Sequence, residues 1–131
     1  MRMAINIDVP ELAPAIEFYS AALGLNLHRI IDDDVAELTG ASSVIYLLAK
    51  NAGSATDSSG AGKRHYSRHW TPVHIDFVVA DVVAAADRAL RSGAKQESEC
   101  VEWKESKCIT FSDPFGHGFC LIEFAADTYS D

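Results

Sequence analysis

The sequence predicts an α+β protein made of two β-α-β-β-β modules. Three observations support this prediction. A strand pattern followed by an amphipathic helix pattern occurs near the N-terminus and again after residue 70. Each helix pattern is followed by three short strand patterns, which turn residues separate. The two halves are joined by a segment rich in Gly, Ala and Ser, a composition typical of flexible connections.

In the first half, alternating apolar residues predict a strand at 3–8, and a helix follows that ends at Gly24, a natural C-terminal cap. The apolar residues of this helix recur on one face, at Leu12, Ile16, Tyr19 and Leu23. Three strands are expected next, at 25–31, 35–39 and 43–50.

The connection between the halves changes character along its length. Residues 51–63 contain almost no bulky apolar side chain, which indicates a flexible linker or mobile loop. Residues 64–70 are cationic, aromatic and rich in His. We consider two interpretations: a loop that packs Tyr66 and Trp70 on the body of the protein, or a lid that supplies cations to an anionic ligand.

The second half repeats the pattern of the first. A strand at 73–79 leads to Asp81, an N-cap residue of the preferred type, and to a helix at 82–92. Three further strands are predicted, at about 96–103, 107–112 and 118–124. We therefore expect a single domain with module one at 1–50, a loop at 51–70, module two at 71–126 and a tail at 127–131.

Composition limits the classes of function. The chain has 131 residues, 48% of them hydrophobic, enough for a sizeable core. A net charge of −8 argues against nucleic-acid and membrane partners. Three cysteines without CxxC spacing favour free thiols in a reducing compartment. We find no apolar run of the roughly 20 residues that a membrane span needs and no signal peptide pattern, so we expect a cytoplasmic protein.

The strand at 73–79 has one unusual face. Ile75, Phe77 and Val79 form an apolar face that the following helix can cover, whereas His74 and Asp76 lie on the other face. An apolar core would not select an imidazole and a carboxylate. The sequence therefore predicts that the functional site lies on this polar face.

Three stretches together resemble a known superfamily. They are IDVPELAPAIEFYSAALGL in the first half, HIDFVVADVVAAADRALRSGA in the second, and FSDPFGHGFCLIEF near the C-terminus. The chain resembles the vicinal oxygen chelate superfamily over residues 3–126. That superfamily includes glyoxalase I, bleomycin-resistance proteins, fosfomycin-resistance enzymes and extradiol dioxygenases. The resemblance implies a glyoxalase-like fold, in which paired modules form curled mixed sheets around a cavity, and a homodimer.

The resemblance also implies a metal site. In the superfamily, each module supplies the first residue of its opening strand and a carboxylate of its closing strand to a divalent metal. His74 and Glu123 match these positions in module two. Ala4 and Leu48, at the positions in module one, have no metal-binding group. A third ligand would have to come from elsewhere, and the candidates are Asp76, Asn6, His65 and His69.

Two alternatives stay open for His74 and Glu123. They bind one divalent ion (Zn²⁺, Ni²⁺, Mn²⁺ or Fe²⁺) with help from a further group, or they form a metal-free hydrogen-bonded pair. Asp76 and Glu123 are the candidate catalytic carboxylates, because two adjacent carboxylates raise one pKa and can make a general base. Cys120 is expected to fill the core. The candidate substrate-binding residues are Asn6, Tyr46, Leu48, Trp70, Trp103, Phe119 and Leu121.

Three functions are compatible with these residues. The first is a metal-dependent lyase, isomerase or dioxygenase that acts on a small oxygenated molecule. The second is a metal-free binding protein that sequesters a drug-like or aromatic compound, which the apolar Ala4 and Leu48 favour. The third is a non-catalytic homodimer whose site has decayed.

Overall fold

The computed structural model describes residues 1–125, which belong to two compact units. The first unit is Met1–Ser67, and the second begins at Arg68. The division falls inside the loop predicted at 51–70. The tail predicted at 127–131 lies outside the described residues.

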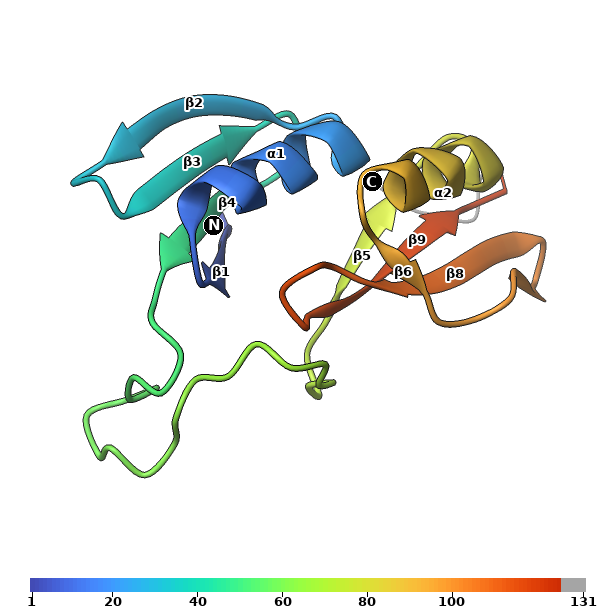
Figure 1. Ribbon diagram of the computed structural model, residues 1–131. Helices are drawn as coiled ribbons and strands as arrows, with labels where there is room; N and C mark the ends of the chain where they lie inside the picture. The colour runs from blue at the N-terminus through green and yellow to red at the C-terminus, as the bar shows by residue number, and fades with distance from the viewer. Residues whose placement is uncertain (126–131) are drawn as a thin grey trace. The chain divides into compact units, whose positions relative to one another are not determined.

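The first unit is a four-stranded sheet with one helix against it (Figure 1). Its elements are β1 (Ala4–Val9), α1 (Leu12–Leu23), β2 (Asn26–Ile31), β3 (Val35–Thr39) and β4 (Val44–Ala49). The strand order is β1-β4-β3-β2, with β1 parallel to β4 and the other pairs antiparallel. The predicted β-α-β-β-β order is confirmed in this unit.

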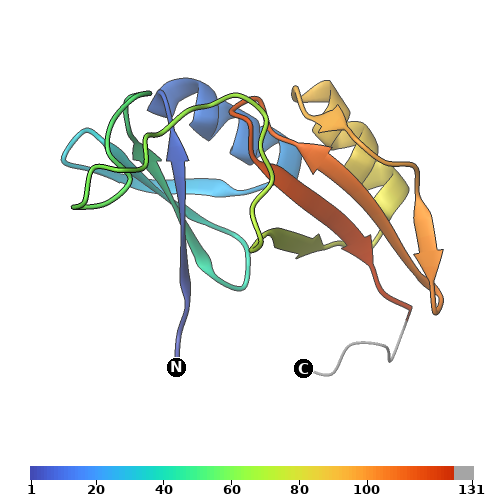
Figure 2. The same cartoon turned by 90° about the horizontal axis from the view of Figure 1, so that it is seen from below.

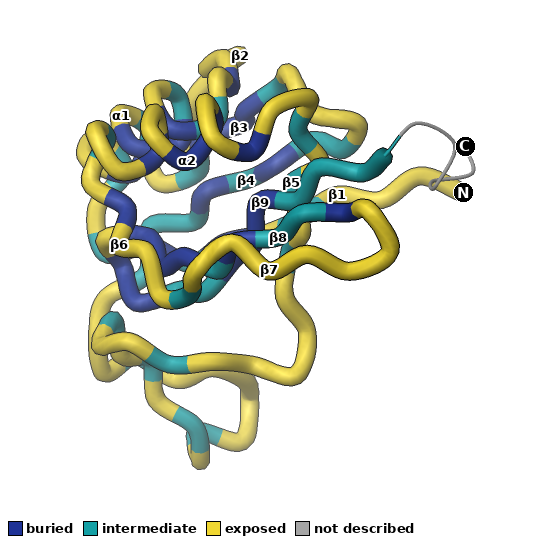
Figure 3. The backbone as a smooth tube through the Cα atoms, turned by 90° about the vertical axis from the view of Figure 1, so that its right-hand side faces the viewer, coloured by how far each residue is buried: buried dark blue, intermediate teal, exposed yellow. Residues whose placement is uncertain are grey.

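The core of the first unit lies between α1 and the sheet. Ile45 and Leu47 of β4 are fully buried, and β3 and β4 are the most buried strands here (Figure 3). The predicted apolar stripe of α1 is partly wrong, because only Tyr19 of its four residues is buried. The buried residues of the helix are Ala15, Phe18, Tyr19 and Ala22. Two alanines on this face allow the helix to approach the sheet closely, which a count of large apolar residues does not reveal.

The second unit repeats this architecture. Its elements are β5 (Ile75–Val78), α2 (Val82–Arg91), β6 (Lys95–Gln96), β7 (Val101–Trp103), β8 (Ser106–Ser112) and β9 (Gly118–Glu123). The strand order is β5-β9-β8-β6, and β7 also pairs with β8. β5 runs parallel to β9, which lies between β5 and β8 (Figure 2). Asp81 caps α2 as predicted, because its carboxylate accepts a hydrogen bond from the Ala84 N–H at 3.0 Å.

The strand predicted at 96–103 is divided into β6 and β7. The cause lies at Ser98, whose hydroxyl accepts a hydrogen bond from the Thr110 N–H at 2.9 Å. The Gln96 side-chain amide donates to the Ser98 carbonyl oxygen at 2.8 Å. Side-chain hydrogen bonds thus replace the regular ladder at this point, and the chain leaves the sheet.

The segment 51–63, which we call the Gly/Ser loop, is exposed along most of its length (Figure 3). It is nevertheless anchored in its own unit. The Arg64 guanidinium donates to the Asp8 carboxylate at 2.7 Å and also to the Ala55 carbonyl oxygen. The Tyr66 hydroxyl donates to the Lys50 carbonyl oxygen at 2.5 Å. Within the described part of the chain, no helix is long and apolar enough to cross a membrane.

Candidate functional site

His74 and Asp76 lie together on the open face of the second sheet. The Nε2 atom of His74 is 3.2 Å from Oδ1 of Asp76, and their side chains are 36% and 45% exposed. The other face of β5 is more buried, because Ile75 and Phe77 point towards the interior of the unit. The predicted polar face therefore exists, and Asp76 lies beside His74.

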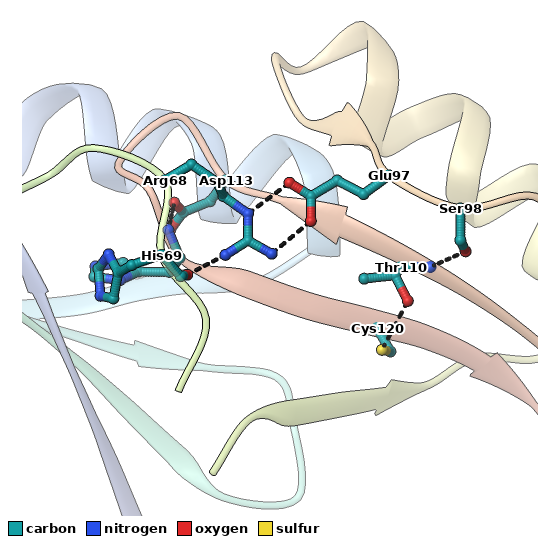
Figure 4. Close-up of polar contacts among 8 residues, drawn as sticks. Arg68, His69, Glu97, Ser98, Thr110, Asp113 and Cys120 are labelled. Carbon is teal, nitrogen blue, oxygen red and sulfur yellow. Dashed lines mark hydrogen bonds and ion pairs between the residues drawn. The ribbon is translucent and has the colours of Figure 1, made fainter. Parts of the chain in front are cut away.

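Cys120 joins these two residues from the neighbouring strand. Asp76 and Cys120 are register partners in the parallel β5–β9 pair, so their side chains share a face. One possible ligand atom from each of His74, Asp76 and Cys120 lies within 4.8 Å of the others. Cys120 is only 6% exposed, so the cluster reaches from the surface into the protein. Figure 4 shows Cys120 beside Thr110 of β8.

Glu123 does not belong to this cluster, and its predicted pairing with His74 and Asp76 is wrong. Side chains alternate along β9, so Glu123 faces the opposite side from Cys120. Its carboxylate accepts a hydrogen bond from the Val82 N–H at 2.8 Å. Glu123 thus lies at the start of α2, where an acid satisfies a free helix N–H and complements the helix dipole.

Phe119 and Leu121 lie on the same face as Glu123, as predicted, but this is the face that α2 covers. Their exposed fractions are 3% and 0%. The Phe119 ring lies 5.9 Å from the Phe77 ring and 5.6 Å from the Phe111 ring, between centroids. The prediction that they line a ligand pocket is therefore wrong, because both side chains fill the core.

The thiols on the open face are held in the protonated form. Burial raises the pKa of Cys120, and a hydrogen bond from Thr110 opposes this rise, whereas the charge of Asp76 adds to it. Burial is also the main reason that the pKa of Cys108 rises to about 11, and the neighbouring Cys120 adds to the effect. Neither thiol is therefore a reactive nucleophile without a metal or another cation beside it.

Trp70 forms one side of the cluster. A Cβ atom on Gly118 would lie 2.1 Å from two atoms of the Trp70 ring, so the indole packs directly on the backbone there. The same ring lies 4.7 Å from the His74 ring, between centroids. Arg68 lies 5.2 Å from the Trp70 ring centroid, and two of its nitrogens contact Glu97 at 2.5 Å (Figure 4). This favours the interpretation of residues 64–70 as a loop packed on the body of the protein.

The other candidate third ligands lie beside other groups of their own units. His69 contacts the His117 ring at 5.5 Å between centroids, and His65 contacts the Ser67 hydroxyl at 2.7 Å. Asn6 belongs to the first unit, where it shares an open face of the sheet with Tyr46, its register partner, and with Leu48. A hydrogen bond to Glu37 is the main reason that the pKa of Tyr46 is raised.

Trp103 is exposed at the end of β7, with the Lys104 ammonium 4.9 Å from its ring centroid. Together with Asn6, Tyr46, Leu48 and Trp70, it stays a predicted ligand contact.

The chemistry of the cluster fits a divalent metal. It offers one imidazole nitrogen, one carboxylate and one sulfur, and all three are ordinary ligands of first-row metals. Among residues 1–125, His74, Asp76 and Cys120 form the one group of three or more His, Cys, Asp or Glu side chains whose ligand atoms all lie within 4.8 Å of one another. Three protein ligands would leave a coordination position for a substrate oxygen or water.

The positions of the large apolar residues in the sequence indicate which face of β9 carries Cys120. Along β8 and β9, large apolar residues alternate with smaller polar ones: Ile109 and Phe111 with Thr110, and Phe119 and Leu121 with Cys120. The larger set must lie under the helix. Cys120 then falls on the face of His74, and Glu123 on the face of the helix.

Comparisons with known proteins agree with this architecture. The glyoxalase-like domain family matches residues 4–122. A glyoxalase-related enzyme from Fulvimarina pelagi is 14% identical, covers 100% of this chain and 99% of its own, and has a TM-score of 0.72. A glyoxalase/bleomycin resistance protein/dioxygenase family enzyme from Burkholderia phytofirmans PsJN is 14% identical over 93% of this chain and 97% of its own, with a TM-score of 0.71.

A third similar structure is lactoylglutathione lyase from Agrobacterium tumefaciens, which is 16% identical over 99% of this chain and 98% of its own, with a TM-score of 0.68. A search of curated proteins finds no match. At these identities the solved structures support the fold alone, whereas the family match covers most of the sequence. The chain therefore belongs to the glyoxalase-like domain family, within the vicinal oxygen chelate superfamily.

Proposed function

We propose that this protein binds a small oxygen-bearing molecule at a divalent metal held by His74, Asp76 and Cys120, and promotes a reaction of the lyase, isomerase or dioxygenase type. The observation that carries the proposal is the approach of three different ligand atoms to within 4.8 Å of one another. The same face is open to solvent at His74 and Asp76, so a small molecule can reach it.

The protein's own residues have distinct roles in this proposal. A bound metal supplies a Lewis acid that polarises an oxygen of the substrate. Asp76 would hold the ion through Oδ1, which lies 3.2 Å from Nε2 of His74. One carboxylate oxygen of Asp76 is then available to take a proton from the substrate. Trp70 lies against His74 and limits the access of water to this side of the site.

Metal binding tests the proposal directly. Protein purified without added metal is titrated with Zn²⁺, Ni²⁺, Mn²⁺ and Fe²⁺ in a calorimeter. We expect one ion per chain with a dissociation constant well below about 1 mM. Asp76→Asn and Cys120→Ser should each weaken binding at least about tenfold, because each removes a ligand. Lack of binding by all four ions would exclude the proposal.

A second candidate is a metal-free binding protein for an aromatic compound. Trp70, Val73 and Val78 are 47%, 84% and 54% exposed. Val78 belongs to β5, and Trp70, Val73 and His74 lie in the segment that leads into this strand. Exposed apolar and aromatic side chains near an acidic group favour a flat, cationic ligand. In a thermal-shift screen with a chelator present, aromatic cations should raise the melting temperature and be recovered unchanged. Conversion of the ligand would exclude simple sequestration.

The homodimer that the resemblance implies stays a prediction. Analytical ultracentrifugation at several protein concentrations tests it, because a dimer sediments as a particle of twice the chain mass of 14.2 kDa.

A further inference from the structure

The open face of the second sheet carries more than the three clustered residues. Asp76 of β5 is the register partner of Cys120 in β9, and Cys120 is in turn the partner of Thr110 in β8. Cys108 precedes Thr110 by two residues and therefore shares its face. Three adjacent strands thus place a carboxylate, two thiols and a hydroxyl on one continuous surface.

These groups contact one another. Oγ1 of Thr110 lies 3.5 Å from Sγ of Cys120 (Figure 4). Cys108 also lies near enough to lower the pKa of the Cys120 thiol, and Asp76 lies near enough to raise it. Cys120 is buried, and Cys108 and Thr110 are half-buried. The sulfur of Cys120 therefore has two hydrogen-bond donors beside it and little contact with water.

This arrangement suits a metal-bound thiolate. A sulfur that binds a metal must lose its proton, which leaves to solvent, and the resulting charge needs partners in a buried position. The Cys108 S–H and the Thr110 O–H are the donors available to it. Groups that hold a metal ligand in this way commonly change metal affinity by about 10- to 100-fold. Sulfur ligands also favour soft and borderline ions over ions that prefer oxygen.

We propose that Cys120 coordinates the metal as a thiolate, that Cys108 and Thr110 are positioning residues for this thiolate, and that the site selects a thiophilic ion such as Zn²⁺ over Mn²⁺. This inference rests on the metal site proposed above and narrows the four candidate ions to zinc and its chemical relatives. The selectivity comes from residues of this chain and does not depend on the substrate.

Cobalt(II) provides a readout that is independent of activity. Co²⁺ is a spectroscopic substitute for Zn²⁺, and a thiolate ligand gives an intense charge-transfer absorption in the near ultraviolet. We expect this band on titration of the intact protein with Co²⁺, its removal by Zn²⁺, and no effect of equimolar Mn²⁺. Zn²⁺ should bind at least about a hundredfold more tightly than Mn²⁺.

Variants then identify the positioning residues. Cys120→Ser should abolish the band. Cys108→Ala and Thr110→Val should each weaken Zn²⁺ binding about tenfold and shift the band, whereas Cys108→Ser, which keeps a donor, should restore most of the affinity. Cys100→Ser controls for the loss of an exposed thiol as such, and it should leave both the band and the Zn²⁺ affinity unchanged.

The possible failures are distinguishable. Binding of Co²⁺ or Zn²⁺ without a thiolate band, or equal affinity for Zn²⁺ and Mn²⁺, overturns this inference and leaves the proposed function intact. Unchanged Zn²⁺ affinity and an unchanged band in folded Cys108→Ala and Thr110→Val, checked by circular dichroism, overturn the positioning roles. Absence of binding by every ion overturns the proposed function itself.

Discussion

Replacement of Glu123 separates the structural role found for this residue from the metal-binding role that the sequence suggested. Its carboxylate accepts the Val82 N–H at 2.8 Å, beside the Asp81 cap on Ala84. Loss of one helix N-terminal acceptor costs about 1 kcal/mol, and the lost interaction with the helix dipole adds about 0.3–1 kcal/mol. Glu123→Ala should therefore lower the free energy of unfolding by about 1–2 kcal/mol. In a chain of 131 residues, this lowers the melting temperature by roughly 3–8 °C.

The assay combines two measurements on each variant. Urea denaturation followed by circular dichroism gives the stability, and calorimetric titration with Zn²⁺ gives the metal affinity. Glu123→Gln keeps an acceptor oxygen, so it should lose less stability than Glu123→Ala, and both should bind Zn²⁺ within about twofold of the unmodified protein. Glu102→Ala, at an exposed position of β7, is the matched control and should change neither quantity.

One result would refute this reasoning. A tenfold or larger loss of Zn²⁺ affinity in Glu123→Gln, with unchanged stability, would mean that the carboxylate reaches the metal and that the assignment of the two faces of β9 is incorrect. A loss of stability with unchanged affinity supports the assignment.

Three other perturbations test the packing around the site and the first unit. Gly118→Ala should displace the Trp70 ring, shift its fluorescence to longer wavelength and lower stability by about 1–3 kcal/mol, because the new methyl group overlaps the indole. Glu97→Gln should make the melting temperature less dependent on pH under acidic conditions. Hydrogen bonds from Arg68 lower the pKa of Glu97, so this carboxylate stabilises the fold above its ordinary pKa of 4.5 and ceases to do so as the pH falls below its folded pKa. The variant should therefore lose less melting temperature than the unmodified protein between about pH 5 and pH 3. Arg64→Gln should speed cleavage of the Gly/Ser loop by a broad-specificity protease several-fold, because it removes the ion pair with Asp8.

These three predictions have internal controls. The Trp103→Phe background isolates the emission of Trp70, and an unshifted spectrum in the Gly118→Ala protein would contradict the close packing. For Glu97, an identical slope of melting temperature against pH in both proteins would show that the ion pair does not contribute. For Arg64, the exposed Arg2→Gln change should leave the cleavage rate unaltered.

The sequence predicted the elements well where the signals are local. Strand alternation, the Asp81 cap and the Gly24 cap depend on neighbouring residues, and all three appear in the structure. The division of the strand at 96–103 was missed, because it depends on a hydrogen bond between Ser98, which follows β6, and Thr110 of β8, 12 residues further along the chain. The helix face of α1 was only partly predicted, because alanines contribute little to a pattern of large apolar residues although they pack closely.

The candidate site likewise combines features that local sequence predicts with features that depend on contacts between distant residues. His74 and Asp76 were predicted to share a polar face, because residues two apart in a strand always do. For β9, alternation fixed only that Cys120 and Glu123 lie on opposite faces. Which of them accompanies His74 depends on the side that α2 covers and on the register of the parallel β5–β9 pair, and both arise from contacts between residues distant in the sequence. The sequence alone therefore determined the modules and the polar strand, and the tertiary structure decided that a thiol, instead of the last carboxylate, completes the cluster.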